Sequence, residues 1–333
     1  MSLRLFLLLP AVSALRVTVA GGSGFVGSRV CKYLVENGAE VTSVSKSGKA
    51  PAGAGSWASS VKWVANDFTR GSMGELEAAL GTPEAFVSCV GTVGFDRQGL
   101  VLGNGKANVD CAKALTNIGG VQRCSYVSVS GELFDSSGWL PGFFVGYFDG
   151  KKMAEAALKD LAPTTIVRPT FIYGGDEFAI APPRVTAEYG EFIEGLLSAG
   201  PFEFLAGVLP GLLKVALRPP VSVDAVAACC ARTALGTVEA GQEIEGTEAI
   251  NGAALFLGRP TGAARPIDGG RRLGCRLRWA QVLVKRLRFA RWTAAFAERQ
   301  NFNHSNIVTF GEGQHVAWLH SRTGLADDFA VNP

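Results

Sequence analysis

The chain has few of the residues that build metal sites and disulfide scaffolds. Its 333 residues include only three histidines and seven cysteines. His304, His315 and His320 lack ligand spacing, and no two cysteines form a Cys-x-x-Cys pair. Most of the cysteines lie in apolar runs, where a reduced, buried thiol is the ordinary state. The sequence therefore predicts neither a metal site nor a disulfide scaffold.

A strong charge of one sign is also missing, because the formal net charge is only +3. The basic excess lies in residues 259–299, which hold eleven basic and two acidic residues. No recognised nucleic-acid-binding module surrounds this segment, so nucleic-acid binding is not expected. Within it, residues 273–296 repeat apolar positions at helical spacing among arginines. Two interpretations stay open: a basic amphipathic helix in peripheral contact with an anionic membrane, or a poorly ordered tail.

The first 14 residues resemble a targeting leader. Arg4 precedes the apolar run 5–11, and Val12-Ser13-Ala14 has the small-residue form of a signal-peptidase site. The run is too short to span a bilayer. The alternative is an uncleaved segment that flanks the first strand. We expect an organellar protein, in a mitochondrion rather than a plastid, and the secretory route stays open.

A glycine-rich turn, Gly21-Gly22-Ser23-Gly24-Phe25-Val26-Gly27, follows the apolar run 15–20. Gly21 allows a tight turn, Gly24 lets the backbone approach a pyrophosphate, and Gly27 lets the next helix pack on the strand. The helix N-terminus then offers free N–H groups to the phosphates. A Walker loop is excluded, because no Gly-Lys-Ser/Thr follows. The turn predicts a dinucleotide site, with Phe25 and Val26 among its contacts.

Strand and helix patterns alternate from residue 15 to about 174. The predicted strands are 15–20, 40–45, 61–64, 85–90, 123–129 and 164–167, and the predicted helices include 25–37, 108–118 and 147–161. Ser72-x-x-Glu75 has the form of a capping box before a further helix. This order predicts an α/β fold, a doubly wound parallel sheet of the Rossmann type with a small C-terminal helical subdomain.

Four segments follow from these patterns. We expect a leader at 1–14, a dinucleotide-binding domain at 15–174, a substrate or lid subdomain at 175–255 that returns to the core, and a basic tail at 256–333.

The residues at the end of the second strand indicate which cofactor is preferred. An acid there would bind the ribose hydroxyl of NAD, whereas the segment is Ser45-Lys46-Ser47, with no acid. Hydroxyls and an ammonium group suit a phosphate, so we favour NADP(H) over NAD(H). A solvated turn that merely carries a lysine is the alternative. Asp67 follows the third strand and is placed either to meet the adenine ring or to form a turn.

The chemical motif is Tyr147-x-x-x-Lys151. Positions i and i+4 share a helix face, so the phenol and the ammonium group would stand together over the cofactor. The ammonium would lower the pKa of Tyr147, letting it act as acid or base on a carbonyl or alcohol, and would also hold the cofactor ribose. Ser130, beyond the fifth strand, is the candidate to polarise a substrate oxygen. A surface pair and a turn-forming serine are the alternatives.

Together these motifs resemble an atypical or extended short-chain dehydrogenase/reductase. The resemblance covers roughly residues 15–250 and includes residues 119–128 and 168–174. It implies Gly91 and Pro169 as further cofactor contacts. The closest pattern is the group of the nucleotide-binding accessory subunit of respiratory complex I and of organellar proteins associated with coenzyme Q synthesis. Residues 219–227 resemble the segment of that group that returns to the core.

The resemblance implies an NADP(H)-dependent oxidoreductase that acts on a carbonyl or hydroxyl of a hydrophobic, quinone-related substrate. Residues 192–217 are the most apolar long segment of the second half, predicted either as subdomain core or as an apolar, membrane-facing wall. The interval from Ser130 to Tyr147 is shorter than in sugar-nucleotide epimerases, so a nucleotide sugar is not expected. The alternative function is a non-catalytic cofactor-binding subunit or regulator, associated with complex I or coenzyme Q synthesis.

Overall fold

The computed structural model describes residues 13–135, 144–175, 184–198 and 216–255, and beyond these only two short strands. The strands are β10 (Thr309–Phe310) and β11 (Gln314–His315), which pair antiparallel. The chain divides into two units, Met1–Thr261 and Gly262–Pro333. The predicted leader up to residue 12, the proposed basic helix and most of the apolar segment 192–217 lie outside the described residues.

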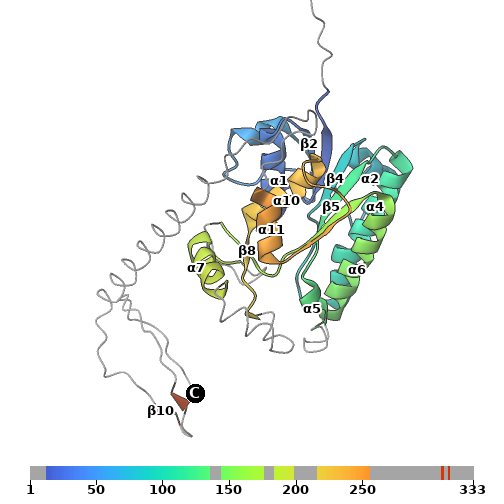
Figure 1. Ribbon diagram of the computed structural model, residues 1–333. Helices are drawn as coiled ribbons and strands as arrows, with labels where there is room; N and C mark the ends of the chain where they lie inside the picture. Colours follow the sequence, from blue (N-terminus) through green and yellow to red (C-terminus); the bar gives the residue numbers. More distant parts are fainter. Residues whose placement is uncertain are drawn as a thin grey trace, which may run out of the picture. The chain divides into compact units, whose positions relative to one another are not determined.

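A seven-stranded sheet forms the centre of the first unit, in the order β3-β2-β1-β4-β5-β6-β9 (Figure 1). Its strands are β1 (Arg16–Ala20), β2 (Glu40–Ser45), β3 (Val61–Ala65), β4 (Ala85–Ser88), β5 (Arg123–Val127), β6 (Thr164–Arg168) and β9 (Glu243–Glu245). Every neighbouring pair is parallel. The predicted doubly wound sheet is therefore confirmed. The strand order reverses between β1 and β4, which is where such sheets hold their ligands.

Helices cover both faces of this sheet (Figure 1). The first cluster of buried residues joins β1 to α1 (Phe25–Glu36), α10 (Val223–Ala234) and α11 (Gly246–Leu255). The second joins the opposite face to α2 (Met73–Leu80), α4 (Ala107–Ile118) and α6 (Phe144–Leu161). Alternation along β1 produces the two layers, since Val17 and Val19 enter the first cluster and Ala20 the second.

Most predicted elements are found within a few residues of their expected bounds. The predicted capping box before α2 is confirmed, because Ser72 and Glu75 exchange side-chain and backbone hydrogen bonds. β4 and β5 end two residues earlier than predicted, so residues 89–90 and 128–129 leave the sheet at its carboxyl edge. The sequence reading missed the seventh strand, β9, which contributes a single buried residue, Ile244.

Several short elements complete the described part. They are η1 (Ser56–Ser60), α3 (Arg97–Val101), the π-helical segment η2 (Leu102–Lys106), α5 (Gly131–Asp135), β7 (Ile172–Tyr173), α7 (Ala187–Leu197) and β8 (Val221–Ser222). β7 and β8 pair parallel. The six cysteines that the structure describes are free. No helix in the described ranges combines the length and apolar composition needed to cross a membrane.

Candidate functional site

A cavity of about 440 Å³ opens beyond the carboxyl ends of β1 to β4. Small-molecule sites commonly have this size. Seven of the predicted cofactor contacts line it, namely Gly21, Gly24, Ser45, Lys46, Ser47, Asp67 and Gly91. Ser23, Phe68, Thr69, Cys89, Val90, Thr92, Gly103 and Ala107, which were not singled out from the sequence, also line it. The remaining predicted contacts, Phe25, Val26, Gly27, Lys151 and Pro169, are not among its lining residues.

The glycine turn has the close packing that a dinucleotide site requires. Gly21 has φ +79°, and its carbonyl oxygen accepts a hydrogen bond from the Gly24 N–H at 2.9 Å. A Cβ placed on Gly27 would lie only 2.2 Å from that same carbonyl oxygen. Gly24 caps α1 without a side-chain bond, which leaves the first-turn N–H groups directed at the cavity. The turn therefore fits a cofactor pyrophosphate.

A group of serine hydroxyls lies at the end of β2. The Ser23 and Ser45 oxygens lie 2.8 Å apart, and Ser47 donates to Ser23 at 3.3 Å. Ser23 also donates to the Lys49 carbonyl oxygen at 2.5 Å. Lys46 extends toward the third strand, with Nζ 3.3 Å from a carboxylate oxygen of Asp67. The wall of the cavity at this end thus offers hydroxyls and an ammonium group, as predicted.

Asp67 forms a turn at the end of β3. Its Oδ1 accepts hydrogen bonds from the backbone N–H and the hydroxyl of Thr69, at 3.1 and 2.7 Å. Partial burial raises the pKa of this carboxyl, but the bonds from Thr69 and the Lys46 ammonium outweigh that effect and hold the pKa below its ordinary value. Asp67 therefore forms the predicted turn and also lines the cavity, while its contact with an adenine ring stays a prediction.

The structure brings Tyr147 and Lys151 together on one face of α6. Lys151 is 5% exposed, and its Nζ donates to the Val127 carbonyl oxygen at 2.9 Å. The same Nζ lies 5.8 Å from the centre of the Tyr147 ring and 4.8 Å from that of Tyr126. A Cβ added to Gly91 would lie 3.4 Å from it. Lys151 thus stands behind Gly91, which lines the cavity.

Burial moves both pKa values. It lowers the pKa of Lys151 to about 8 and raises the pKa of Tyr147 to about 12. The predicted lowering of the Tyr147 pKa is therefore wrong for this structure, because loss of solvent around the phenol dominates. At neutral pH Tyr147 is a protonated phenol beside a charged ammonium group.

Asn104 is a buried residue of this wall that the sequence reading missed. It lies in η2, and its amide donates to the carbonyl oxygens of Thr92 and Leu100, both at 2.9 Å. A Cβ on Gly91 would lie 3.0 Å from Asn104 Oδ1. Single π-helical turns frequently mark functional sites. The signal in the sequence was the pair of amides four residues apart, Asn104 and Asn108, which share one helix face.

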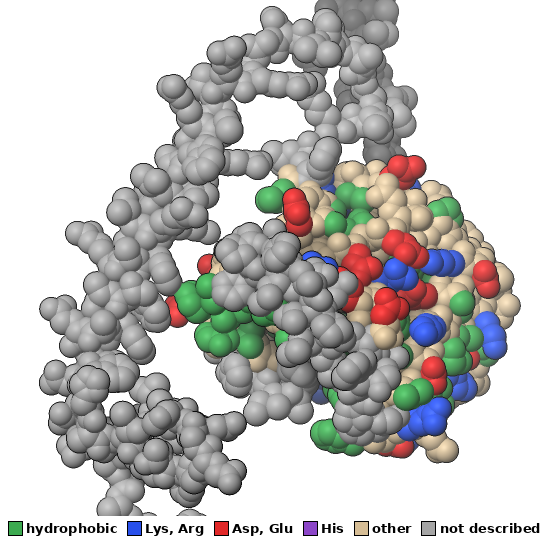
Figure 2. Space-filling model, turned by 60° about the horizontal axis from the view of Figure 1, so that its bottom comes forward, with side chains coloured by type: hydrophobic (Ala, Val, Ile, Leu, Met, Phe, Trp, Pro, Cys, Tyr) green, Lys and Arg blue, Asp and Glu red, His purple; other side chains and the backbone are tan. Residues whose placement is uncertain are grey.

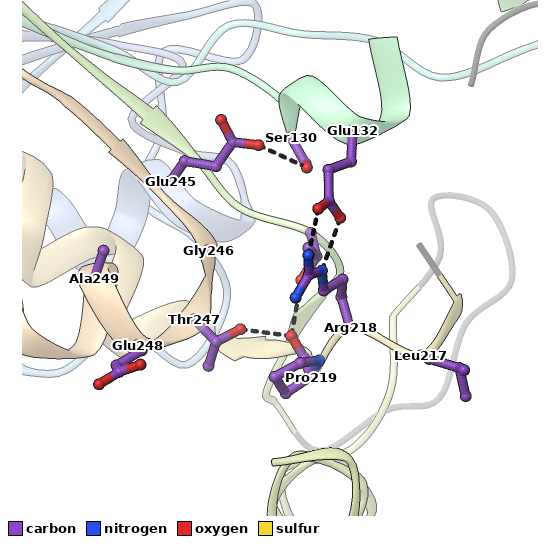
Figure 3. A pocket seen from close by; sticks show the side chains of 11 residues that line it. Ser130, Glu132, Leu217, Arg218, Pro219, Glu245, Gly246, Thr247, Glu248 and Ala249 are labelled. Carbon is purple, nitrogen blue, oxygen red and sulfur yellow. Dashed lines mark hydrogen bonds and ion pairs between the residues drawn. The ribbon is translucent and has the colours of Figure 1, made fainter. Parts of the chain in front are cut away.

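Ser130 faces a second cavity, of about 610 Å³, beyond the carboxyl ends of β5, β6 and β9 (Figure 3). Its hydroxyl donates to Glu245 Oε1 at 2.9 Å, and its N–H donates to the Pro169 carbonyl oxygen at 3.0 Å. Pro169 therefore fixes the backbone of Ser130. Glu132 forms a two-pronged ion pair with Arg218 on the opposite wall. The serine hydroxyl is engaged by a carboxylate and is directed at this second cavity.

Residues 17–115 match the NAD dependent epimerase/dehydratase family. The matched segment runs from β1 through most of α4, so it contains the glycine turn, the end of β2 and Asp67. The expected resemblance to the NAD(P)-binding folds of short-chain dehydrogenases/reductases is confirmed by this match. The resemblance to the complex I accessory subunit stays a prediction.

Two relatives share parts of the sequence. A chloroplastic protein of Arabidopsis thaliana, described as uncharacterized, is 41% identical over 167 residues, which are 49% of this chain and 52% of that protein. The MIOREX complex component 2 of Saccharomyces cerevisiae is 43% identical over 56 residues, 16% of this chain and 20% of that protein. The chain thus spans about half the length of the first relative and a fifth of the second.

Solved structures with a similar fold include two enzymes of Bordetella bronchiseptica. WbmG, in complex with NAD, is 15% identical, with a TM-score of 0.47 over 78% of this chain and 84% of that chain. WbmH, in complex with NAD+, is 14% identical, with a TM-score of 0.48 over 70% of this chain and 75% of that chain.

Proposed function

We propose that the protein is an NADP(H)-dependent oxidoreductase acting on a carbonyl or hydroxyl group. The observation that carries the proposal is the placement of Lys151 and Tyr147. A buried lysine stands behind Gly91, which lines the first cavity, and a partly buried tyrosine lies one helical turn before it. A lysine is almost never fully buried unless it is paired. The family whose model matches residues 17–115 is described as NAD dependent, which supports a nicotinamide cofactor.

The cofactor would supply a hydride to the substrate carbon. The chain's own residues would manage the accompanying proton. Burial raises the pKa of Tyr147 to about 12, so this phenol is protonated at neutral pH, and in the proposed reduction it would donate its proton to the carbonyl oxygen. Lys151 would hold the cofactor ribose, and its ammonium group would stabilise the phenolate that remains. The first-turn N–H groups of α1 would bind the pyrophosphate.

The preference for NADP(H) is supported by the residues at the end of β2. Ser23, Ser45 and Ser47 present a connected set of hydroxyls, and Lys46 adds a positive charge on the same wall. Lys46 already pairs with Asp67, so a phosphate would share the ammonium group with that carboxylate. The net effect favours the 2′-phosphate, because hydroxyl and ammonium donors have no acid of β2 opposing them.

The hydrophobic, quinone-related substrate remains part of the proposal, and it rests on the apolar segment 192–217. In the described part of this region α7 exposes Tyr189, Phe192 and Leu196. Figure 2 shows a group of hydrophobic side chains on the side of the molecule where Figure 1 places α7. The cavity beside Ser130, in contrast, is walled by charged residues. A substrate with a polar reacting end and an apolar tail would suit both features.

The second candidate function is a subunit that holds the cofactor and turns over nothing. It is favoured by one observation, the engagement of the Ser130 hydroxyl with Glu245, which leaves that hydroxyl without a proton to offer a substrate oxygen. Association with complex I or with coenzyme Q synthesis belongs to this alternative. An organellar location is proposed for either function, in agreement with the chloroplastic location of the Arabidopsis thaliana relative.

Titration of the full chain with NADPH and with NADH tests the proposal. Following cofactor fluorescence, we expect NADPH to bind about tenfold tighter, equivalent to about 1.4 kcal/mol. Lys46→Ala should narrow that difference, whereas Lys62→Ala, which changes an exposed lysine of β3, should leave it unchanged. Equal affinities in the parent protein would contradict the phosphate assignment. Oxidation of bound NADPH by short- and long-chain ketones and quinones then separates the enzyme from the silent subunit.

A further inference from the structure

Four polar residues follow one another at every fourth position of α6. They are Tyr147, Lys151, Glu155 and Lys159, and residues four apart share one helix face. Two of them, Lys151 and Glu155, are buried, with 5% and 8% exposure. Charged residues are almost never buried unless they are paired. The proposed chemistry uses Tyr147 and Lys151, which leaves the buried carboxylate of Glu155 without an assigned role.

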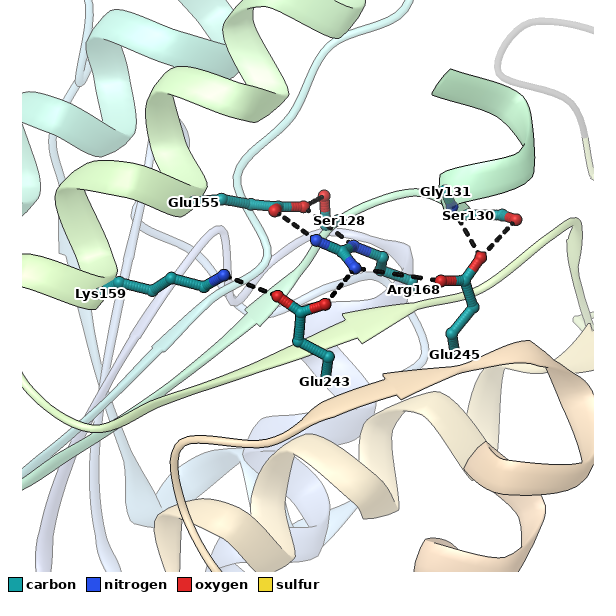
Figure 4. A network of polar contacts seen from close by, with 8 residues as sticks. All are labelled: Ser128, Ser130, Gly131, Glu155, Lys159, Arg168, Glu243 and Glu245. Atoms are coloured by element: carbon teal, nitrogen blue, oxygen red, sulfur yellow. Dashed lines mark hydrogen bonds and ion pairs between the residues drawn. The ribbon is translucent and has the colours of Figure 1, made fainter. Parts of the chain in front are cut away.

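Hydrogen bonds from two strands fix this carboxylate (Figure 4). The Ser128 hydroxyl, just beyond β5, donates to Oε1 at 2.5 Å. The Arg168 guanidinium, at the end of β6, donates to Oε2 at 2.7 Å and to Oε1 at 3.3 Å. Three hydrogen bonds thus hold the carboxylate and leave the side chain little rotational freedom.

The same strand also binds Lys151. Its Nζ donates to the carbonyl oxygen of Val127, and the next residue, Ser128, binds Glu155. Two successive turns of α6 are therefore attached to two consecutive residues at the end of β5. This attachment places the Glu155 carboxylate on the helix turn beside the Lys151 ammonium group.

Glu155 lies between the buried ammonium group of Lys151 and the partly buried guanidinium group of Arg168. Beyond it, Arg168 contacts Glu243 at 2.5 Å and Glu245 at 3.9 Å, and Lys159 contacts Glu243 at 2.6 Å (Figure 4). The whole group contains three cations and three carboxylates. Arg168 therefore has other acidic partners if Glu155 is lost. For Lys151, Glu155 is the carboxylate of the described residues whose charge raises the lysine pKa.

We propose that Glu155 is a positioning residue for Lys151, and that its carboxylate, fixed by Ser128 and Arg168, keeps the neighbouring ammonium group charged and in place at the cofactor wall. The proposal rests on the proposed function only in assigning Lys151 to the cofactor. It concerns a residue that touches neither cofactor nor substrate, and its effect passes through Lys151.

The groups around Lys151 agree with this role. Cys89 faces it from the end of β4, Tyr126 from β5, Tyr147 and Glu155 from α6, and the uncharged Asn104 from η2. Burial raises the pKa of Cys89 to about 12 and that of Tyr126 well above its ordinary value, so both are neutral at pH 7. Burial lowers the pKa of Lys151, and Cys89 and, to a smaller extent, Glu155 oppose that lowering. Because Cys89 is neutral at pH 7, Glu155 is the acidic group of this set that supports the charge of Lys151.

The test is a direct titration of Lys151 in the full chain without cofactor. Lysine side-chain carbons are labelled with ¹³C, the Lys151 signal is assigned by its loss in Lys151→Arg, and its midpoint is followed by NMR. Glu155→Gln keeps the shape and loses the charge, and we expect the midpoint to fall by about one pH unit. Glu155→Asp should restore part of the shift. Glu243→Gln, a matched change at the far end of the network, should move it by no more than a few tenths.

A second variant guards against loss of folding. Glu155→Gln combined with Arg168→Gln removes both members of the pair, and a smaller fall of the Lys151 midpoint is expected. An unchanged midpoint in both variants would overturn the proposal. The pH dependence of the NADPH dissociation constant is the second readout. In Glu155→Gln, the loss of NADPH affinity at alkaline pH should begin at a lower pH, by the same shift as the Lys151 midpoint. If NADPH fails to bind the parent protein, the proposed function fails, while the lysine titration still decides the role of Glu155.

Discussion

Two glycines of one turn allow cofactor binding to be separated from folding. Gly24 is exposed and has an extended backbone, with φ −81° and ψ 178°, so a larger residue fits its conformation. Gly27 is buried in α1 against the carbonyl of Gly21. We therefore compare Gly24→Val, which adds bulk toward the cavity, with Gly27→Ala, which adds one methyl group toward the backbone.

The cost of Gly27→Ala follows from its surroundings. The new Cβ would lie 2.2 Å from the Gly21 oxygen and 2.8 Å from two further backbone atoms, so the turn itself must move. Overpacking of this kind costs up to about 3 kcal/mol. Replacing glycine by alanine inside a helix raises the free energy of unfolding by about 1 kcal/mol. The expected net loss of unfolding free energy is therefore about 2 kcal/mol.

The cost of Gly24→Val is mainly in binding. A Cβ on Gly24 would lie 3.1 Å from the Gly21 carbonyl oxygen, so the turn must shift slightly. An apolar residue at the N-cap adds a cost of about 1 kcal/mol relative to glycine. A valine side chain would occupy the space that the pyrophosphate needs above the first turn of α1. We expect NADPH affinity to fall at least about 100-fold, which corresponds to about 2.7 kcal/mol.

Urea unfolding by circular dichroism and NADPH titration by fluorescence measure the two effects. Gly74→Ala is the matched control, because a Cβ there meets nothing within 4 Å. It should keep the parent affinity and change stability by less than about 1 kcal/mol in the favourable direction. Parent-like NADPH affinity in Gly24→Val would refute the assignment of this turn to the pyrophosphate. A parent-like unfolding curve in Gly27→Ala would refute the packing argument.

Further predictions concern the Tyr147 and Lys151 pair. In an active preparation Tyr147→Phe should leave NADPH binding nearly unchanged and reduce turnover roughly 100-fold, because the ring still packs but the proton is gone; unchanged turnover would move the chemistry elsewhere. NADPH affinity should fall roughly tenfold from pH 7 to pH 9, since Lys151 loses its charge as the pH passes its pKa of about 8. Lys151→Arg should remove this pH dependence of the NADPH affinity. The contribution of Lys151 to folding has the opposite sign: its pKa rises to about 10.5 on unfolding, so stability due to this residue increases between pH 8 and 10.5.

The sequence predicted the strands of the nucleotide-binding half because each carries its own local signal. Val17 and Val19 alternate with smaller or polar residues, and Gly21 and Gly81 stand where the turn and the helix end need them. β9 had no such signal. It is three residues long, with two glutamates around Ile244, and it is a strand because Val167 and its neighbours in β6 offer a free edge.

The site was predictable in part for the same reason. Glycines, the residues after β2 and the i, i+4 pair on α6 are local patterns, and most of the predicted cofactor contacts line one cavity. The partners of the catalytic candidates are not local. Glu155 reaches Arg168 across two elements, and Ser130 meets Glu245 from more than a hundred residues away. The raised pKa of Tyr147 likewise depends on how tightly the surrounding helices close, which spacing alone does not reveal.

Ser130 and Tyr147 differ in a way that bears on the choice between enzyme and silent subunit. Tyr147 is protonated at neutral pH and lies beside a charged lysine, as the proposed proton donor must. The Ser130 hydroxyl already donates a hydrogen bond to Glu245. The Glu245 carboxylate also accepts the Gly131 N–H at 2.7 Å and lies 3.9 Å from Arg168. The side chain of Glu245→Gln would still accept the Gly131 N–H, but its hydrogen bond from the Ser130 hydroxyl would be weaker. If the protein is an enzyme that uses Ser130, this change should raise turnover or leave it intact; if turnover instead requires the carboxylate, Glu245 and not Ser130 is the polar group that meets the substrate.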